Sequence, residues 1–151
     1  MAAEEFKPLK EIGAIPLSET SELKFYVDEY RGRTYASVRA FLKRESYAGP
    51  TRSGVTLSAP LLEGVIEALS KLPQEPQALE DRELGRFPKR AGLELVLRVT
   101  IYKDSTGIDL REWVDDMAYK GWSKKGVRIP YQELGKALQY LREMRELLGP
   151  K

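Results

Sequence analysis

The sequence contains neither cysteine nor histidine among its 151 residues. Without cysteine there can be no disulfide framework, no thiolate nucleophile and no cysteine-ligated zinc or iron–sulfur centre. Without histidine, the usual serine triad, imidazole acid–base catalysis and His-ligated metals are excluded. No apolar run approaches the roughly 18 residues of a transmembrane helix, and the first residues lack the pattern of a signal peptide. We therefore expect a cytoplasmic, non-catalytic protein with no cofactor, no metal and no membrane partner.

What the chain does contain is typical of a globular domain. The sequence is 42% hydrophobic and 32% charged, and 25 Lys and Arg residues nearly balance 23 Asp and Glu residues, for a net charge of +2. This composition is too apolar for a disordered chain. The length predicts one domain, or two small units that share a core.

The sequence contains an internal tandem repeat. A shift of 72 residues, without gaps, superimposes residues 22–72 on residues 94–144 and gives 12 identities in 51 positions, where average residue usage gives about three by chance. We therefore divide the chain into an N-terminal arm or edge strand (1–21), repeat 1 (22–72), a proline-rich charged linker (73–93) and repeat 2 (94–148).

Within each repeat, strands precede one helix. In repeat 1 apolar and polar residues alternate over residues 22–30 and 33–41, which predicts two strands. We expect a third extended segment over 42–47, a turn at Gly49-Pro50 and a fourth strand over 53–58. An apolar stripe at helical spacing then follows Ser58, a predicted N-cap. We predict an α+β fold of two ββββα repeats, each a curved antiparallel sheet with a C-terminal helix. The two repeats would pack helix to helix as an intramolecular pseudo-dimer, with the outer sheet faces open to solvent.

The predicted outer face of repeat 1 is rich in cations and rings. Between Tyr30 and Ser53 there are six basic residues and one acid, with tyrosine and phenylalanine interleaved among them. Such a surface suits single-stranded nucleic acid, because bases stack on rings while phosphates meet Arg and Lys. Aromatic residues are also common on the solvent face of any strand. The recurrence of the pattern at Tyr102-Lys103 and Arg111-Glu112-Trp113 favours the binding function.

The run Tyr30-Arg31-Gly32-Arg33 and the strand that follows it to Phe41 resemble the motif of the transcriptional positive cofactor four proteins. Repeat 2 supplies the end of that motif as Asp109-Leu110-Arg111-Glu112-Trp113, followed by Lys124-Lys125-Gly126-Val127. Repeat 1 is also similar to the Pur-alpha repeat through Phe25-Tyr26-Val27-Asp28. The resemblance covers most of residues 22–148. It implies a Whirly-like fold and the binding of single-stranded nucleic acid.

Carried over by position, the motif places an aromatic contact at the end of one strand, basic residues in the turn, and an arginine and a ring on the next strand. Together with the other basic residues of these faces, we predict a nucleic-acid-binding set of Tyr30, Arg31, Arg33, Tyr35, Arg39, Phe41, Lys43, Arg44, Arg52, Tyr102, Lys103, Arg111, Trp113, Lys124 and Lys125.

The two repeats differ in charge. Asp115-Asp116 of repeat 2 stand where repeat 1 has Lys43-Arg44, and Asp104 and Ser105 replace the turn glycine and its second basic residue. We therefore expect repeat 1 to be the principal binding surface, so that Arg33→Ala weakens binding more than Lys124→Ala does.

The function we predict is low-specificity binding of single-stranded DNA in transcription regulation, replication or repair. RNA binding or RNA-chaperone activity is the alternative, because nothing in the sequence reports on the 2′-hydroxyl. A protein-interaction scaffold and a Mg²⁺-dependent nuclease built on Asp109, Asp115 and Asp116 are further alternatives. A homodimer, contact with the transcription machinery and, in a bacterium, association with the nucleoid are also open.

Overall fold

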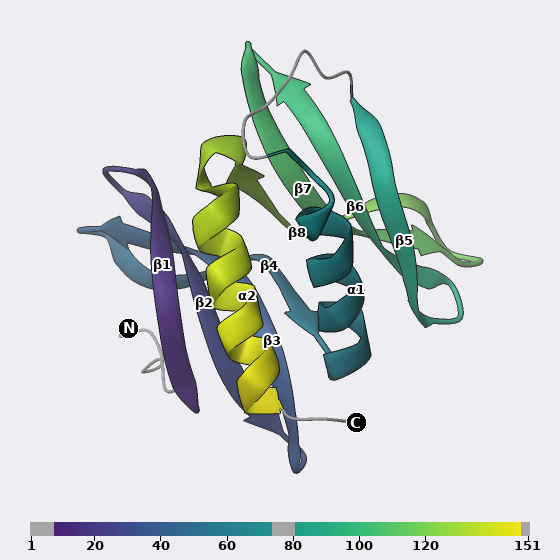
Figure 1. Cartoon of the computed structure of the whole chain (residues 1–151), viewed down its shortest axis with the longest axis horizontal. Helices are drawn as coiled ribbons and strands as arrows, with labels where there is room; N and C mark the ends of the chain where they lie inside the picture. Colours follow the sequence, from purple (N-terminus) through teal and green to yellow (C-terminus); the bar gives the residue numbers. More distant parts are fainter. Residues whose placement is uncertain (1–7, 74–80, 149–151) are drawn as a thin grey trace.

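The computed structural model describes residues 8–73 and 81–148. They form two four-stranded antiparallel sheets, each followed by a helix, with strand orders β1-β2-β3-β4 and β5-β6-β7-β8 (Figure 1). The α+β fold of two ββββα repeats is therefore confirmed. The strands are β1 (Lys10–Ser18), β2 (Ser21–Tyr30), β3 (Arg33–Arg44), β4 (Tyr47–Leu57), β5 (Arg82–Arg90), β6 (Leu93–Tyr102), β7 (Ser105–Asp115) and β8 (Lys120–Pro130); the helices are α1 (Ala59–Ser70), a 3₁₀ turn η1 (Tyr131–Glu133) and α2 (Leu134–Leu148).

The first strand of each sheet comes from a segment that the sequence analysis placed outside the repeats. β1 lies in the predicted arm, as an edge strand, and β5 lies in the predicted linker. The linker prediction is therefore wrong for residues 82–90, while residues 1–7 and 74–80 lie outside the described part of the chain. A shift of 72 residues also superimposes β1 on β5, including bulges at Glu11/Gly13 and at Glu83/Gly85.

The prediction of a separate extended segment over 42–47 is also wrong. β3 continues without a break to Arg44, the chain turns at residues 45–46, and β4 begins at Tyr47 and pairs Ala48 with Lys43. The bulge between Arg39 and Phe41 allows this long hairpin to bend. The predicted turn at Gly49-Pro50 is instead part of β4.

One core fills the space between the sheets and the helices. Alternate residues of the central strands, such as Phe25 and Val38, are buried and pair directly across β2 and β3. Four residues of the α1 stripe are buried with them, as are five of α2. Both repeats contribute to the same cluster. No helix in the described ranges is long and apolar enough to cross a membrane.

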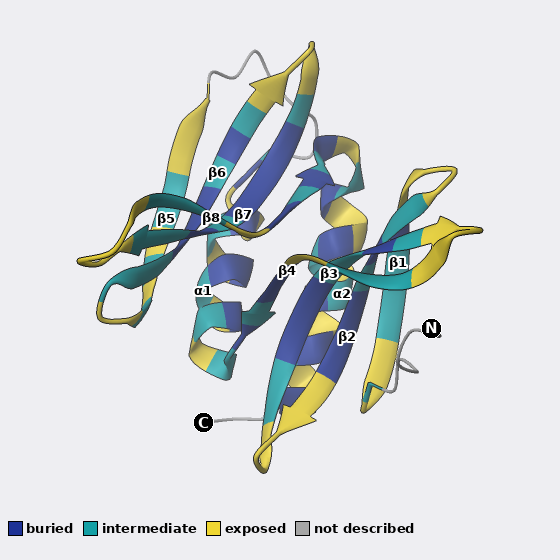
Figure 2. Ribbon diagram, turned by 180° about the vertical axis from the view of Figure 1, so that it is seen from behind, coloured by how far each residue is buried: buried dark blue, intermediate teal, exposed yellow. Residues whose placement is uncertain are grey.

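The two helices pack on each other, as predicted. The helix of repeat 2, α2, packs on the sheet of repeat 1. α2 lies over the first sheet, where the Tyr140 ring sits on Gly13 of β1 and 5.2 Å from the Phe25 ring of β2. α1 lies against β5, where a Cβ on Gly64 would come within 2.7 Å of the Phe87 ring. An ion pair of 3.1 Å between Arg145 and Glu63 joins the helices. The hairpin tips are exposed, whereas the middles of the central strands are buried (Figure 2).

Candidate nucleic-acid interface

Tight hairpins place the two predicted tyrosines at exposed tips. Arg31 and Gly32 both have positive φ, 52° and 78°, as do Lys103 and Asp104, at 49° and 63°, which is the pattern of a type I′ turn. Tyr30 and Tyr102 are 62% and 63% exposed. The Arg31 guanidinium lies 5.2 Å from the Tyr30 ring and the Lys103 ammonium 5.4 Å from the Tyr102 ring. Arg33 is exposed on the same tip as Tyr30.

A glycine on the neighbouring strand positions each strand arginine. Arg39 of β3 pairs with Gly54 of β4, and a Cβ at Gly54 would lie 2.6 Å from the Arg39 Cζ. Arg111 lies over Gly126 in the same way, at 2.7 Å. The bare backbone thus lets the arginine cross the strand. This requirement explains why a glycine stands at this position in both repeats.

The two arginines differ in their partners. Arg39 donates hydrogen bonds to the Tyr26 hydroxyl, at 3.2 Å, and to the carbonyl oxygen of Thr51, at 2.9 Å. Both acceptors are uncharged, so the guanidinium charge is not neutralised. Arg111 instead lies 3.6 Å from the carboxylate of Asp109, which occupies the position of Ser37 in repeat 1.

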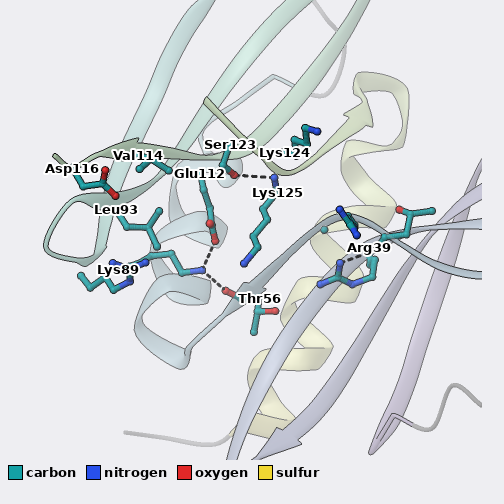
Figure 3. Close-up of a pocket in the computed structure, with 14 residues that line it drawn as sticks. Arg39, Thr56, Lys89, Leu93, Glu112, Val114, Asp116, Ser123, Lys124 and Lys125 are labelled. Atoms are coloured by element: carbon teal, nitrogen blue, oxygen red, sulfur yellow. Dashed lines mark hydrogen bonds and ion pairs between the residues drawn. The ribbon is translucent and has the colours of Figure 1, made fainter. Parts of the chain in front are cut away.

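Arg39 lines a cleft of about 900 Å³ between the two sheets, together with residues of β4, β5, β6, β7 and β8 (Figure 3). Six cationic side chains and two acidic ones line it: Arg39, Arg52, Lys89, Arg90, Lys124 and Lys125 against Glu112 and Asp116. In the described part of the chain, no ion pair joins Arg39, Arg52, Lys124 or Lys125 to an acid. The cleft therefore has a surplus of positive charge, which low-dielectric walls focus.

Sequence reasoning missed the β5 wall of this cleft. Lys89 and Arg90 lie in the segment interpreted as a neutral linker. The Lys89 ammonium lies 2.7 Å from Oε2 of Glu112, whose carboxylate is buried, and donates a 3.3 Å hydrogen bond to the carbonyl oxygen of Thr56. The regular alternation of β7 gave no sign that Glu112 would need a partner 23 residues away.

The predicted stacking rings on the strands are not open platforms. Phe41 lies on the outer face as predicted but is only 4% exposed, with the Tyr26 ring edge-on at 6.3 Å and the Lys24 ammonium 4.9 Å above it. Trp113 is half-buried against Trp122, with 4.8 Å between the ring centroids. These rings pack the outer face, so the expectation that Phe41 presents its ring to solvent is wrong.

The remaining predicted residues are scattered. Tyr35 is half-buried and lines a separate groove beside Lys89. Lys43 is paired with Glu22 at 3.4 Å, and Arg44 is exposed at the β3–β4 hairpin. The structure therefore brings together Arg39, Arg52, Lys124 and Lys125, and leaves the two hairpin tips apart from them.

On the outer face of the second sheet, one buried carboxylate, that of Asp109, pairs with two arginines, Arg98 and Arg111. Arg98 lies 3.5 Å from Asp109 and 4.4 Å from the Trp122 ring, and Arg128 donates to Thr100 and Ser105. At its edge, a hydrogen bond to Glu83 raises the pKa of Arg86, whose guanidinium lies 5.9 Å from the Trp113 ring. The expectation that repeat 1 is the principal binding surface stays a prediction, and two lysines of repeat 2, Lys124 and Lys125, line the cleft.

The three aspartates considered for a metal site do not converge. Asp109 pairs with Arg98 and Arg111, whereas Asp116 accepts hydrogen bonds from the backbone of Ala118 and Tyr119 in the β7–β8 hairpin. Within the described ranges no three carboxylates form a group that could hold a metal ion.

Comparison with known proteins gives distant likenesses. No protein-family model and no curated protein sequence matches the chain. Among solved structures, the chain is similar to the crystal structure of WHY3 from Arabidopsis thaliana, with 10% identity and a TM-score of 0.48 over 97% of this chain and 90% of that one. It is also similar to the plant transcriptional regulator PBF-2, with 11% identity and a TM-score of 0.39 over 94% and 88% of the two chains. At these values the α+β assignment rests on the strand order of this chain alone.

Proposed function

We propose that the protein binds single-stranded nucleic acid, foremost DNA, with low sequence specificity. The observation that carries the proposal is the cleft between the sheets, where six cations face two acids. Phosphate contacts by Arg and Lys supply most of the affinity of non-specific nucleic-acid binding. RNA is the alternative ligand, because the cleft offers the same phosphate contacts to both.

The arrangement favours a single strand over a duplex. The cationic side chains lie on two walls of a cleft, one from β3 and β4 and the other from β5 and β8. A flexible strand can enter such a cleft, whereas the charges of a duplex lie on its outside. A protein of this kind would act where single strands are exposed, in transcription, replication or repair, in the cytoplasm or at a bacterial nucleoid.

The first test is fluorescence anisotropy of a labelled single strand of about 20 nucleotides, beside its duplex and its RNA equivalent, at several salt concentrations. We expect the single strand to bind more tightly than the duplex, with affinity falling steeply as salt rises. Equal affinity for the duplex, or no binding at low salt, would overturn the proposal.

Matched variants locate the site. Arg39→Ala removes the unneutralised guanidinium of the cleft, and we expect a loss of about tenfold in affinity and a salt slope lower by about one. Arg111→Ala removes the equivalent residue of repeat 2, which lies outside the cleft lining and pairs with Asp109, a carboxylate that it shares with Arg98. Its effect should stay below about twofold. Equal losses would place the strand elsewhere.

A further inference from the structure

A second hollow adjoins the cationic cleft. It has a volume of about 600 Å³ and is lined mainly by rings and apolar side chains: Tyr35, Pro60, Leu61, Phe87 and Pro88. Two residues, Thr56 and Lys89, line both the groove and the cleft. Lys89 is the only charged residue of the groove lining.

Two acceptors fix the Lys89 ammonium at this junction, and one of its N–H groups makes no described hydrogen bond. Its ammonium carries three N–H groups, and the described contacts use two of them, on Glu112 at 2.7 Å and on the Thr56 carbonyl oxygen at 3.3 Å. The side chain remains 20% exposed. Because two acceptors fix the ammonium, the third N–H can meet an anion without further ordering of the side chain.

The equivalent place, in which the two repeats exchange roles, carries different residues. The positions equivalent to Lys89 and Glu112 carry Leu17 and Ala40, and Ser18 stands for Arg90. Gly107 stands where the groove has Tyr35. The ring, the ammonium and the carboxylate that anchors it thus occur together once in the molecule.

We infer that the apolar groove is a nucleobase subsite and that Lys89 binds the phosphate between the base held there and the strand in the cleft. This inference rests on the proposed function and deepens it. Nucleotides alternate an apolar base with an anionic phosphate, and the groove and cleft present an aromatic, apolar surface next to a cationic one. The groove lining is mainly apolar, so it reads the face of a base and discriminates little between bases.

A double variant tests Lys89. Lys89→Leu with Glu112→Ala transplants the pair found in repeat 1 and leaves no buried carboxylate without a partner, which alone would be strongly destabilising. We expect affinity for a single strand to fall about tenfold, and the salt slope to fall by about one. An unchanged slope in the folded variant would show that Lys89 contacts no phosphate.

Tyr35→Ala tests the base subsite by a different signature. Loss of stacking should lower affinity about tenfold while leaving the salt slope unchanged, because the ring carries no charge. The wild-type protein supplies a readout that needs no variant. A strand carrying 5-bromouracil should photocrosslink to the peptide that contains Tyr35 or Phe87.

The outcomes separate the two claims. If the wild-type chain binds no strand at low salt, the proposed function itself fails. If it binds, but the crosslinks map only to the tips at Tyr30 and Tyr102 and the double variant keeps its salt slope, the cleft function stands and the base subsite is wrong. A double variant that does not fold leaves the crosslinking to decide.

Discussion

Two glycines control how the strand arginines are presented. Arg39 crosses β4 over Gly54, and Arg111 crosses β8 over Gly126. At Gly54 the nearest atoms are the guanidinium Cζ and Nη1 of Arg39, which can swing away from an added methyl group, whereas at Gly126 the Arg111 Cβ, fixed to the backbone, also lies 2.9 Å from the added position. A substitution at Gly54 therefore moves an arginine more than it disturbs the core.

Gly54→Ala should displace Arg39 from Thr51 and weaken single-strand binding several-fold, at a cost of about 1 kcal/mol in stability. Gly126→Ala is the matched control, since it displaces an arginine that lies outside the cleft lining and pairs with Asp109. Anisotropy titrations at one salt concentration compare the two. Equal affinities for both variants would show that the position of Arg39 does not matter to the ligand.

At the scale of elements, α2 covers a sheet to which it is not adjacent in sequence. Tyr140 of α2 packs on β1 and β2, more than 100 residues earlier in the chain. The stability of the first sheet therefore depends on the last helix.

Tyr140→Ala should lower the free energy of unfolding by about 2 kcal/mol, less than for a fully buried ring because Tyr140 is half-exposed. Hydrogen exchange should accelerate first in β1 and β2. Phe87→Ala, which removes a contact of β5 with α1, should instead expose β5 and its neighbour. Faster exchange confined to β5 and β6 in the Tyr140 variant would contradict this helix arrangement.

The sequence predicts the regular elements well and the irregular ones badly. Alternation identifies β2 and most of β3, and the apolar stripes identify both helices. Pro16 and Pro88, with bulges on either side, hide the alternation of β1 and β5. The available signal was the repeat itself, because Glu11/Glu83, Gly13/Gly85 and Pro16/Pro88 are identical at the same shift of 72.

The site is less predictable than the fold for a physical reason. Residues such as Arg39 and Arg52 belong to a local pattern, so spacing finds them. The Lys89–Glu112 pair joins two strands that are not neighbours in the sheet, and which helix covers which sheet depends on packing that two similar apolar stripes leave undecided. Burial of Phe41 likewise depends on Tyr26 and Lys24 from the next strand.

At the scale of the whole molecule, the single shared core predicts that both repeats unfold together. Both tryptophans, Trp113 and Trp122, lie in repeat 2, so their fluorescence reports on that repeat, whereas circular dichroism reports on both. Val38→Ala in the core of repeat 1 should shift both urea transitions equally, by about 2 kcal/mol. Arg44→Ala, on the exposed hairpin, should shift neither. A tryptophan transition that ignores Val38→Ala would show two independent units.

The packing of α2 on the first sheet also has a consequence for synthesis of the chain. The first sheet leaves the ribosome without its cover, because the helix that covers it follows all eight described strands in the sequence. At about 5–20 residues per second, the 91 residues from the end of β4 at Leu57 to the end of α2 at Leu148 take roughly 5–18 s to translate. During that interval the apolar face around Phe25 and Val38 lacks α2, and an exposed apolar face of this kind favours aggregation and chaperone binding.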